Sequence, residues 1–192
     1  MTLHPEPAHS HLPPVTVTLL ESVSSDEACC LKSQIRITSQ ALSSESETPT
    51  SVEFTHFFFH AWPDHGVPAE DHRASLVSFI RLVDQHPGEG PMVVGCSAGV
   101  GRTGSYIALC SLLRAHGALS PASYTIYPPE NREPWLGPIT KDPDIPEQLK
   151  LMIQDDEVVQ EIDSLRDQRP SMVQRSEQAL LVYQVLRDVL ES

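Results

Sequence analysis

Alternating hydrophobic and polar residues predict three strands in the first third of the chain. Residues 15–19 alternate and are rich in β-branched side chains, and residues 30–38 contain a second alternating run. Residues 52–59 include four phenylalanines, which favour a third strand. The Ser-, Thr- and Glu-rich residues 39–51 predict a loop or a disordered insert, and the Pro- and His-rich residues 1–14 predict an irregular start.

After residue 68 the apolar residues follow a helical period. Residues 69–85 predict a helix with one apolar face, formed by Leu76, Phe79, Ile80 and Val83. Residues 101–116 predict a second helix, ended by Gly117, whose apolar residues surround much of its circumference, so we expect it in the core. Residues 91–95, directly before it, predict a short buried strand.

The last third of the chain is less regular. The Pro-rich residues 117–148 predict a connecting insert, residues 147–166 are weakly helical, and residues 174–190 predict a final helix. Strands first and helices later favour an α/β fold of the α+β type, with a twisted mixed sheet flanked by helices. The length of 192 residues suits a single domain, which we expect to span residues 15–192.

Composition narrows the function classes. A formal net charge of -13 argues against nucleic-acid and anionic-membrane partners, although a small site can still be locally positive. The four cysteines form no metal-ligand spacing, and their free thiols fit a cytoplasmic location. The sequence shows no signal peptide and no apolar run long enough to cross a membrane, and it leaves the oligomeric state open.

The residues around Cys96 carry the clearest candidate chemistry. Arg102 stands six positions after Cys96, and a predicted helix follows. Phosphoryl transfer spreads negative charge over oxygens that backbone N–H groups, an arginine fork and a helix N-terminus can bind together. Tight turns at glycines would direct such N–H groups to one point from Ser97, Ala98, Gly99, Val100, Gly101 and Arg102.

The same surroundings favour a thiolate at Cys96. Helix N-termini and cations lower thiol pKa values, and the thiolate is the nucleophilic form. The hydroxyl of Thr103 could reach the sulfur and stabilise it as it departs. A bare Cys-x5-Arg spacing is a weak signal, but the predicted strand before it, the glycine-spaced loop and the helix after it argue against coincidence.

Other candidates are more ambiguous. Asp64 could protonate a leaving oxygen from the turn-rich loop at residues 62–68, or it could only form the turn. Gln174 could position a water, but a capping box at residues 171–174 is the preferred explanation from the residues alone. Mixed spacing favours surface or turn positions over metal ligation for the clustered histidines His56, His60, His65 and His72.

Three segments together resemble the motifs of cysteine-dependent protein tyrosine phosphatases of the receptor and non-receptor type. Residues 96–104 (CSAGVGRTG) resemble the phosphate-binding loop of that family, residues 59–68 (FHAWPDHGVP) its mobile acid loop, and residues 168–178 (QRPSMVQRSEQ) its glutamine loop. They occur in the family's order, and the resemblance covers roughly residues 15–190. The insert at residues 117–165 is most similar to fungal members.

The resemblance implies a role for each matching residue, and it implies no metal and no cofactor. Cys96 would be the nucleophile, Arg102 the phosphate clamp, and Asp64 the general acid and then the base. The remaining roles are thiolate departure, the loop hinge, water positioning and its assistance, which fall to Thr103, Trp62, Gln174 and Gln178 respectively.

The chain departs from the family pattern in two ways. Gly95 stands where the family has a histidine that orders the loop and helps to lower the thiol pKa, so we expect a less acidic Cys96 and a more flexible loop. Residues 1–14 also lack the family's tyrosine-bearing loop, which predicts an N-terminally incomplete domain.

These observations leave three hypotheses. The first is hydrolysis of phosphotyrosine in proteins through a phospho-cysteine intermediate. The second is a weakly active pseudophosphatase that binds phosphotyrosine peptides. The third, dual-specificity or inositide dephosphorylation, is disfavoured by the acid loop and the glutamine loop.

Overall fold

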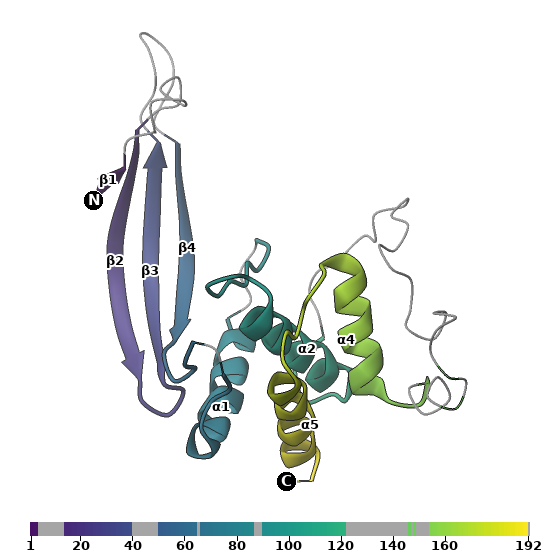
Figure 1. The fold of residues 1–192 in the computed structure, drawn as a ribbon. Coiled ribbons are helices and arrows are strands. Elements are labelled where there is room, and N and C mark those ends of the chain that lie inside the picture. Colours follow the sequence, from purple (N-terminus) through teal and green to yellow (C-terminus); the bar gives the residue numbers. More distant parts are fainter. Residues whose placement is uncertain are drawn as a thin grey trace. The chain divides into compact units, whose positions relative to one another are not determined.

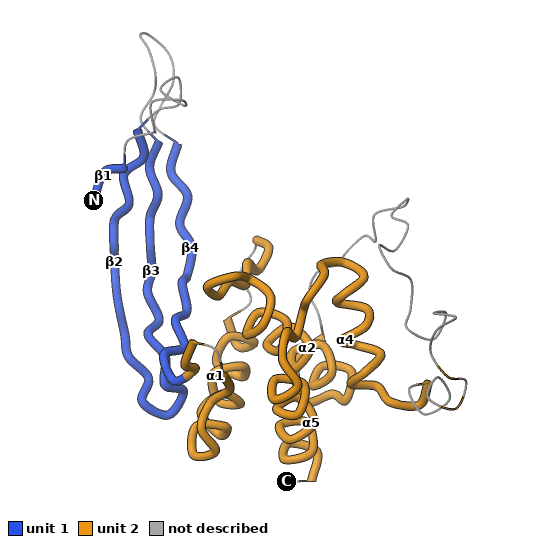
Figure 2. Tube along the Cα trace, in the orientation of Figure 1, with its two compact units in different colours: residues 1–61 blue, residues 62–192 orange. Residues whose placement is uncertain are grey.

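The computed structural model describes residues 1–3, 14–39, 50–64, 66–86, 90–121, 146, 148 and 154–191. The chain divides into two compact units, Met1–Ala61 and Trp62–Ser192 (Figure 2). The regular elements of the first unit are all strands, and those described in the second are all helical.

The first unit is one sheet in the order β1-β2-β3-β4 (Figure 1). Its strands are β1 (Thr2–Leu3), β2 (Val15–Ser25), β3 (Cys30–Ser39) and β4 (Thr50–Phe59). The three strands predicted from the sequence are therefore confirmed. Every pairing among the described strands is antiparallel, so the prediction of a mixed sheet is corrected for this part of the chain.

Two boundaries in this unit differ from the sequence prediction. β2 continues well past Leu19, because the register shifts between Leu19 and Glu21 and this bulge hides the second half of the strand from a simple alternation pattern. β1 lies within the segment expected to be irregular, where Thr2 and Leu3 pair with the start of β2.

Rows of residues across the strands alternate between apolar and polar. Ile35 of β3 lies opposite Leu19 on β2 and Phe54 on β4, forming an apolar row. In the next row Arg36 lies opposite Glu53, and the two side chains form an ion pair at 2.6 Å. Because neighbouring rows face opposite sides of a sheet, one face is apolar where the other is polar.

The second unit contains four described helices, together with the 3-10 turn η2 (Glu70–His72). They are α1 (Arg73–Asp84), α2 (Gly101–Ala115), α4 (Glu157–Gln168) and α5 (Ser176–Leu190). α2 contacts both α4 and α5, and its Leu109 and Leu113 are almost completely buried. The prediction of a core helix after the Cys96 loop is thus confirmed.

The predicted faces and ends of these helices are mostly confirmed. The four apolar residues expected on one face of α1 are all buried. Gly117 follows α2 with a φ of +73°, as expected for a glycine that ends a helix. α4 begins only at Glu157, because the Asp156 side chain accepts hydrogen bonds from the N–H groups of Val158 and Val159 and caps the helix there.

The short buried strand predicted at residues 91–95 is wrong. These residues form no regular element, and Met92 and Val93 are 58% and 91% exposed. An apolar run becomes a strand only when it finds a hydrogen-bonding partner, and this run pairs with no described strand. Most of the predicted insert, residues 122–145, lies outside the described residues, as does most of the predicted loop at 40–49.

The start of α2 packs very closely against the segment that joins α4 to α5. A Cβ atom at Gly104 would lie 2.4 Å from the backbone nitrogen of Val173 and 3.1 Å from the carbonyl carbon of Met172. A Cβ atom at Gly101 would lie 2.8 Å from Nε2 of Gln178. Only glycine permits this approach, so these two positions bring the α4–α5 segment to the Cys96 loop.

We expect Gly104→Ala to lower the free energy of unfolding by about 1–3 kcal/mol, since the added methyl group overpacks the contact with Val173. This loss exceeds the gain of about 1 kcal/mol that alanine brings to a helix interior. Urea unfolding measures the effect. Gly90→Ala is the control, because a Cβ atom at Gly90 meets nothing within 4 Å. An unchanged or higher midpoint for Gly104→Ala would contradict the close approach.

Candidate active site

Cys96 begins a tight loop that leads into α2. The backbone N–H of Gly99 donates a hydrogen bond to Cys96 Sγ at 3.2 Å, so the loop turns back onto the sulfur. Gly99 has a φ of +69°, in the left-handed region that glycine adopts readily. Val100 is the N-cap of α2 and makes no side-chain cap, which leaves the positive end of the helix open to an anion.

The Cys96 thiol is more acidic than an ordinary cysteine. Partial burial opposes ionisation, but hydrogen bonds from the Thr103 hydroxyl and from the N–H groups of Thr103, Gly99 and Val100 outweigh it and lower the pKa to about 7. Thr103 Oγ1 is buried and satisfies no other hydrogen bond among the described residues, so its proton is available to the sulfur. The low pKa is reached with Gly95 before the cysteine.

Arg102 joins the acid loop to the phosphate-binding loop. Its Nη1 donates a hydrogen bond to the Trp62 carbonyl at 3.2 Å, and its Nη2 forms an ion pair with Asp64. The Arg102 side chain is 24% exposed and that of Asp64 is 68% exposed. The structure therefore brings together the two groups predicted as clamp and acid, although 38 residues separate them in the sequence.

The acid loop is anchored at both ends. Trp62 is buried, and its indole Nε1 donates a hydrogen bond to the Gly66 carbonyl at 2.9 Å. Pro68 is fully buried at the other end. Anchored ends with an exposed Asp64 between them suit the predicted hinge at Trp62, which stays a prediction.

The two glutamines are placed differently from the sequence expectation. Gln174 is exposed and lies just before α5, outside the helix predicted to contain it. The neighbouring Val173 donates its N–H to the Val100 carbonyl at 3.3 Å, which brings this segment to the start of α2. Gln178 is buried, and its Oε1 accepts the Arg175 N–H at 3.2 Å. The capping box thus lies at residues 175–178, and the alternative at residues 171–174 is wrong.

Sequence reasoning missed two arginines that support the site. Nη2 of Arg169 donates a hydrogen bond to the Ala98 carbonyl at 3.3 Å. Arg166 donates from Nε to the Met172 carbonyl at 2.9 Å and from Nη2 to the Val173 carbonyl at 2.8 Å. Both act on backbone oxygens, and a pattern of residue types carries no signal for such contacts.

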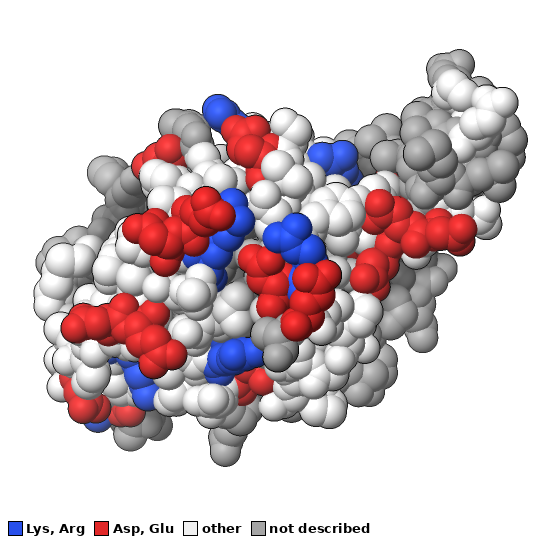
Figure 3. Space-filling model, turned by 90° about the horizontal axis from the view of Figure 1, so that it is seen from below, with Lys and Arg blue, Asp and Glu red and all other residues white. Residues whose placement is uncertain are grey.

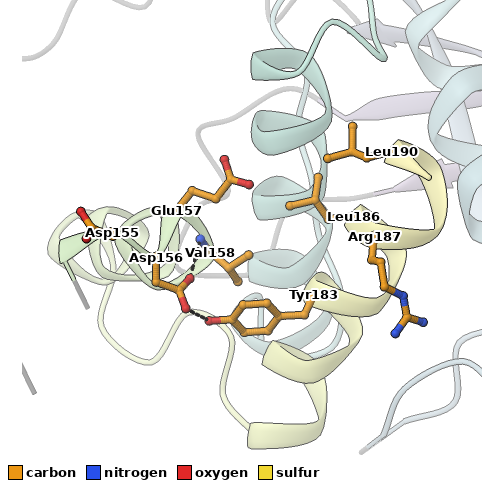
Figure 4. A pocket seen from close by; sticks show the side chains of 8 residues that line it. All are labelled: Asp155, Asp156, Glu157, Val158, Tyr183, Leu186, Arg187 and Leu190. Carbon is orange, nitrogen blue, oxygen red and sulfur yellow. Dashed lines mark hydrogen bonds between the residues drawn. The ribbon is translucent and has the colours of Figure 1, made fainter. Parts of the chain in front are cut away.

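Other candidate features lie elsewhere. A surface pocket of about 510 Å³ between the start of α4 and α5 contains none of the candidate catalytic residues; there Tyr183 donates a hydrogen bond to Asp156 at 2.6 Å (Figure 4). The described residues contain no group of three possible metal ligands and no helix able to cross a membrane; His65 is outside them. Acidic side chains form several separate groups on the face drawn in Figure 3, with basic ones between them.

Comparison with known proteins identifies the family. The family model described as "Protein-tyrosine phosphatase" matches residues 7–122, which is more than half of the chain. The chain therefore belongs to the protein-tyrosine phosphatase family.

Two curated relatives illustrate the match. Mouse receptor-type tyrosine-protein phosphatase epsilon is 32% identical over 139 residues, which cover 70% of this chain and 15% of the relative. Tyrosine-protein phosphatase 2 of Schizosaccharomyces pombe is 30% identical over 180 residues, which cover 87% of this chain and 21% of the relative. Since mammalian and fungal relatives match at similar identity, the fungal likeness of the insert stays a prediction.

Solved structures confirm the fold class. Trypanosoma brucei protein tyrosine phosphatase TbPTP1 superposes with a TM-score of 0.59 at 21% identity and covers 93% of this chain and 50% of that chain. The catalytic domain of human protein tyrosine phosphatase non-receptor type 18 has a TM-score of 0.56 at 23% identity and covers 91% and 48%. The chain spans about half the length of these structures.

We expect Thr103→Val to raise the pKa of Cys96 by roughly half a unit to one unit, because valine keeps the shape of threonine but lacks the hydroxyl that lowers the pKa. The rate of Cys96 alkylation by iodoacetamide as a function of pH, followed by mass spectrometry, measures this shift. Urea unfolding is the control for the fold, since Oγ1 makes no other hydrogen bond within the described part of the chain. An unchanged pKa would show that the hydroxyl does not serve the sulfur.

Proposed function

We propose that the protein hydrolyses phosphotyrosine in proteins through a phospho-cysteine intermediate. The observation that carries this proposal is the Cys96 thiol with a pKa of about 7, inside a loop whose N–H groups face the sulfur. Arg102 at the start of the following helix and Asp64 paired with it supply the other two groups that phosphate-ester cleavage needs.

In the first step the Cys96 thiolate attacks phosphorus, and an S–P bond forms as the bond to the tyrosine oxygen breaks. The loop N–H groups and the Arg102 guanidinium hold the oxygens over which negative charge spreads. The phosphate takes over the guanidinium fork on which Asp64 now lies, and this exchange leaves Asp64 beside the leaving oxygen. A protonated Asp64 then gives its proton to that oxygen.

In the second step water attacks the phospho-cysteine, and the S–P bond breaks to release phosphate and the thiolate. Asp64 takes the proton from the water, and Gln174 positions that water with help from Gln178. The buried Thr103 hydroxyl stabilises the departing thiolate, as its effect on the Cys96 pKa supports. No step needs a metal or a cofactor.

Tyrosine-phosphorylated proteins are the proposed substrates, and signal transduction in the cytoplasm is the proposed setting. Protein tyrosine phosphatase PTPN18, a structural neighbour, has been solved in complex with a HER2 phosphopeptide. The four cysteines are all free thiols, which suits a reducing compartment.

Gly95 favours a second candidate function, a binding module that turns over slowly. Gly95 is exposed, and a Cβ atom at this position would meet nothing within 4 Å. The loop therefore receives no side-chain support from the residue before the nucleophile. Such a protein would bind a phosphotyrosine peptide in the same loop with negligible phosphate release.

Cys96→Ser should abolish phosphate release from a phosphotyrosine peptide, because a serine hydroxyl is not ionised near neutral pH. Asp64→Asn should lower kcat by roughly 10²–10⁴-fold, the usual contribution of a general acid. Asp71→Asn removes an exposed carboxylate from η2 and is the matched control, with activity expected within about twofold of the unmodified protein. An active Cys96→Ser variant would overturn the proposed function.

Gly95→His should raise turnover by up to about tenfold if a missing imidazole limits activation of the thiol. The open space around Gly95 admits the ring without displacing a neighbour. Phosphate release and the alkylation pKa of Cys96 are measured together. If the unmodified protein binds the peptide without releasing phosphate and Gly95→His does not change this, the binding-module function is favoured.

A further inference from the structure

We propose that Arg169 is a positioning residue that holds the Cys96 loop in its anion-binding shape from the α4–α5 segment, residues 169–175. This inference concerns the site of the proposed function and rests on it. Arg169 makes no contact with a reacting atom in this account; it acts through the backbone of the loop.

The geometry of the loop creates the need for such support. When successive N–H groups point inward to one centre, the carbonyl groups between them point outward and must find donors elsewhere. Two outward carbonyls receive hydrogen bonds from the α4–α5 segment: Ala98 from Arg169 Nη2 at 3.3 Å, and Val100 from the Val173 N–H at 3.3 Å. These bonds flank Gly99, whose N–H donates to the sulfur.

Arg169 also covers the flexible point of the loop. Its Nη2 and Cζ lie 3.3 Å and 3.6 Å from the position where a Cβ atom of Gly99 would be. Because Gly99 has a φ of +69° and no side chain, little else restricts this turn. The guanidinium therefore occupies the place of a side chain that the turn itself excludes.

The α4–α5 segment is rigid enough to act as a support. Ser171 and Val173 have φ values of 68° and 53°, a conformation that non-glycine residues adopt only when their surroundings hold them there. Arg166 of α4 supplies that hold through its two hydrogen bonds to the Met172 and Val173 carbonyls. Val173 is completely buried.

The alternative is that Arg169 is an exposed arginine whose charge acts only through space. The two accounts differ in their salt dependence, because a field from an exposed charge is screened by salt whereas a hydrogen bond that fixes the loop is not. They also differ for Arg169→Met and Arg169→Lys, since lysine keeps the charge and one donor but lacks the planar fork.

The test measures the pKa of Cys96 from iodoacetamide alkylation, which needs no phosphatase activity, together with kcat/KM for a phosphotyrosine peptide. Arg169→Met should raise the pKa of Cys96 at both low and high salt and lower kcat/KM by about threefold to tenfold. Arg169→Lys should restore part of both effects. Arg187→Met, which removes an exposed arginine paired with Asp188 on α5, is the matched control and should change neither.

Each outcome decides between the accounts. A pKa shift that vanishes at high salt, or an unchanged pKa in Arg169→Met, would overturn the positioning role. If the pKa shifts as expected but the unmodified protein releases no phosphate, the positioning role stands and the proposed hydrolase function fails. Urea unfolding of Arg169→Met should match that of Arg187→Met, and a general loss of stability would attribute the shift to unfolding and sink the proposal.

Discussion

The close approach of α2 to the α4–α5 segment is the constraint on which the candidate site depends. Gly101 and Gly104 remove the side chains that would stand between them, and the backbone of Val173 fills the space. That approach has two consequences: the Val173 N–H reaches the carbonyl at the end of the Cys96 loop, and Gln174 is carried to the same end of α2. The shape of the loop is therefore set by packing between elements far apart in the sequence.

Local dipoles explain how a strongly acidic chain can bind an anion. The formal net charge is -13, yet the groups that face the Cys96 sulfur are N–H groups, a hydroxyl and the first turn of a helix. Their effect acts over one or two bonds of distance, where the summed charge of distant carboxylates is screened. The thiol pKa responds to these few donors and not to the overall charge.

Much of the site could be predicted from the sequence because its signals are local. The helix after the Cys96 loop, the glycine that permits the turn and the reach of Thr103 to the sulfur all depend on residues within a few positions of one another. The meeting of Asp64 and Arg102 required the order of three motifs, since no local rule brings residues 38 positions apart into an ion pair. The roles of Gln174 and Trp62 still rest on that resemblance.

The predictions that failed share a different cause. The run at 91–95 has the composition of a buried strand, but a strand exists only with a partner, and pairing is a long-range property. The bulge after Leu19 and the cap at Asp156 moved boundaries because one residue breaks a period or begins a helix.

Arg166 and Arg169 show the same limit from the other side. An arginine that binds backbone carbonyls can do so wherever the fold places an unsatisfied oxygen, so its sequence neighbours do not reveal the partner. The Cys96 loop consequently has a signature that can be read from its own residues, whereas the groups that hold it in shape become visible only in three dimensions. A substitution far from the signature can therefore change the chemistry of Cys96 while every residue of the motif remains in place.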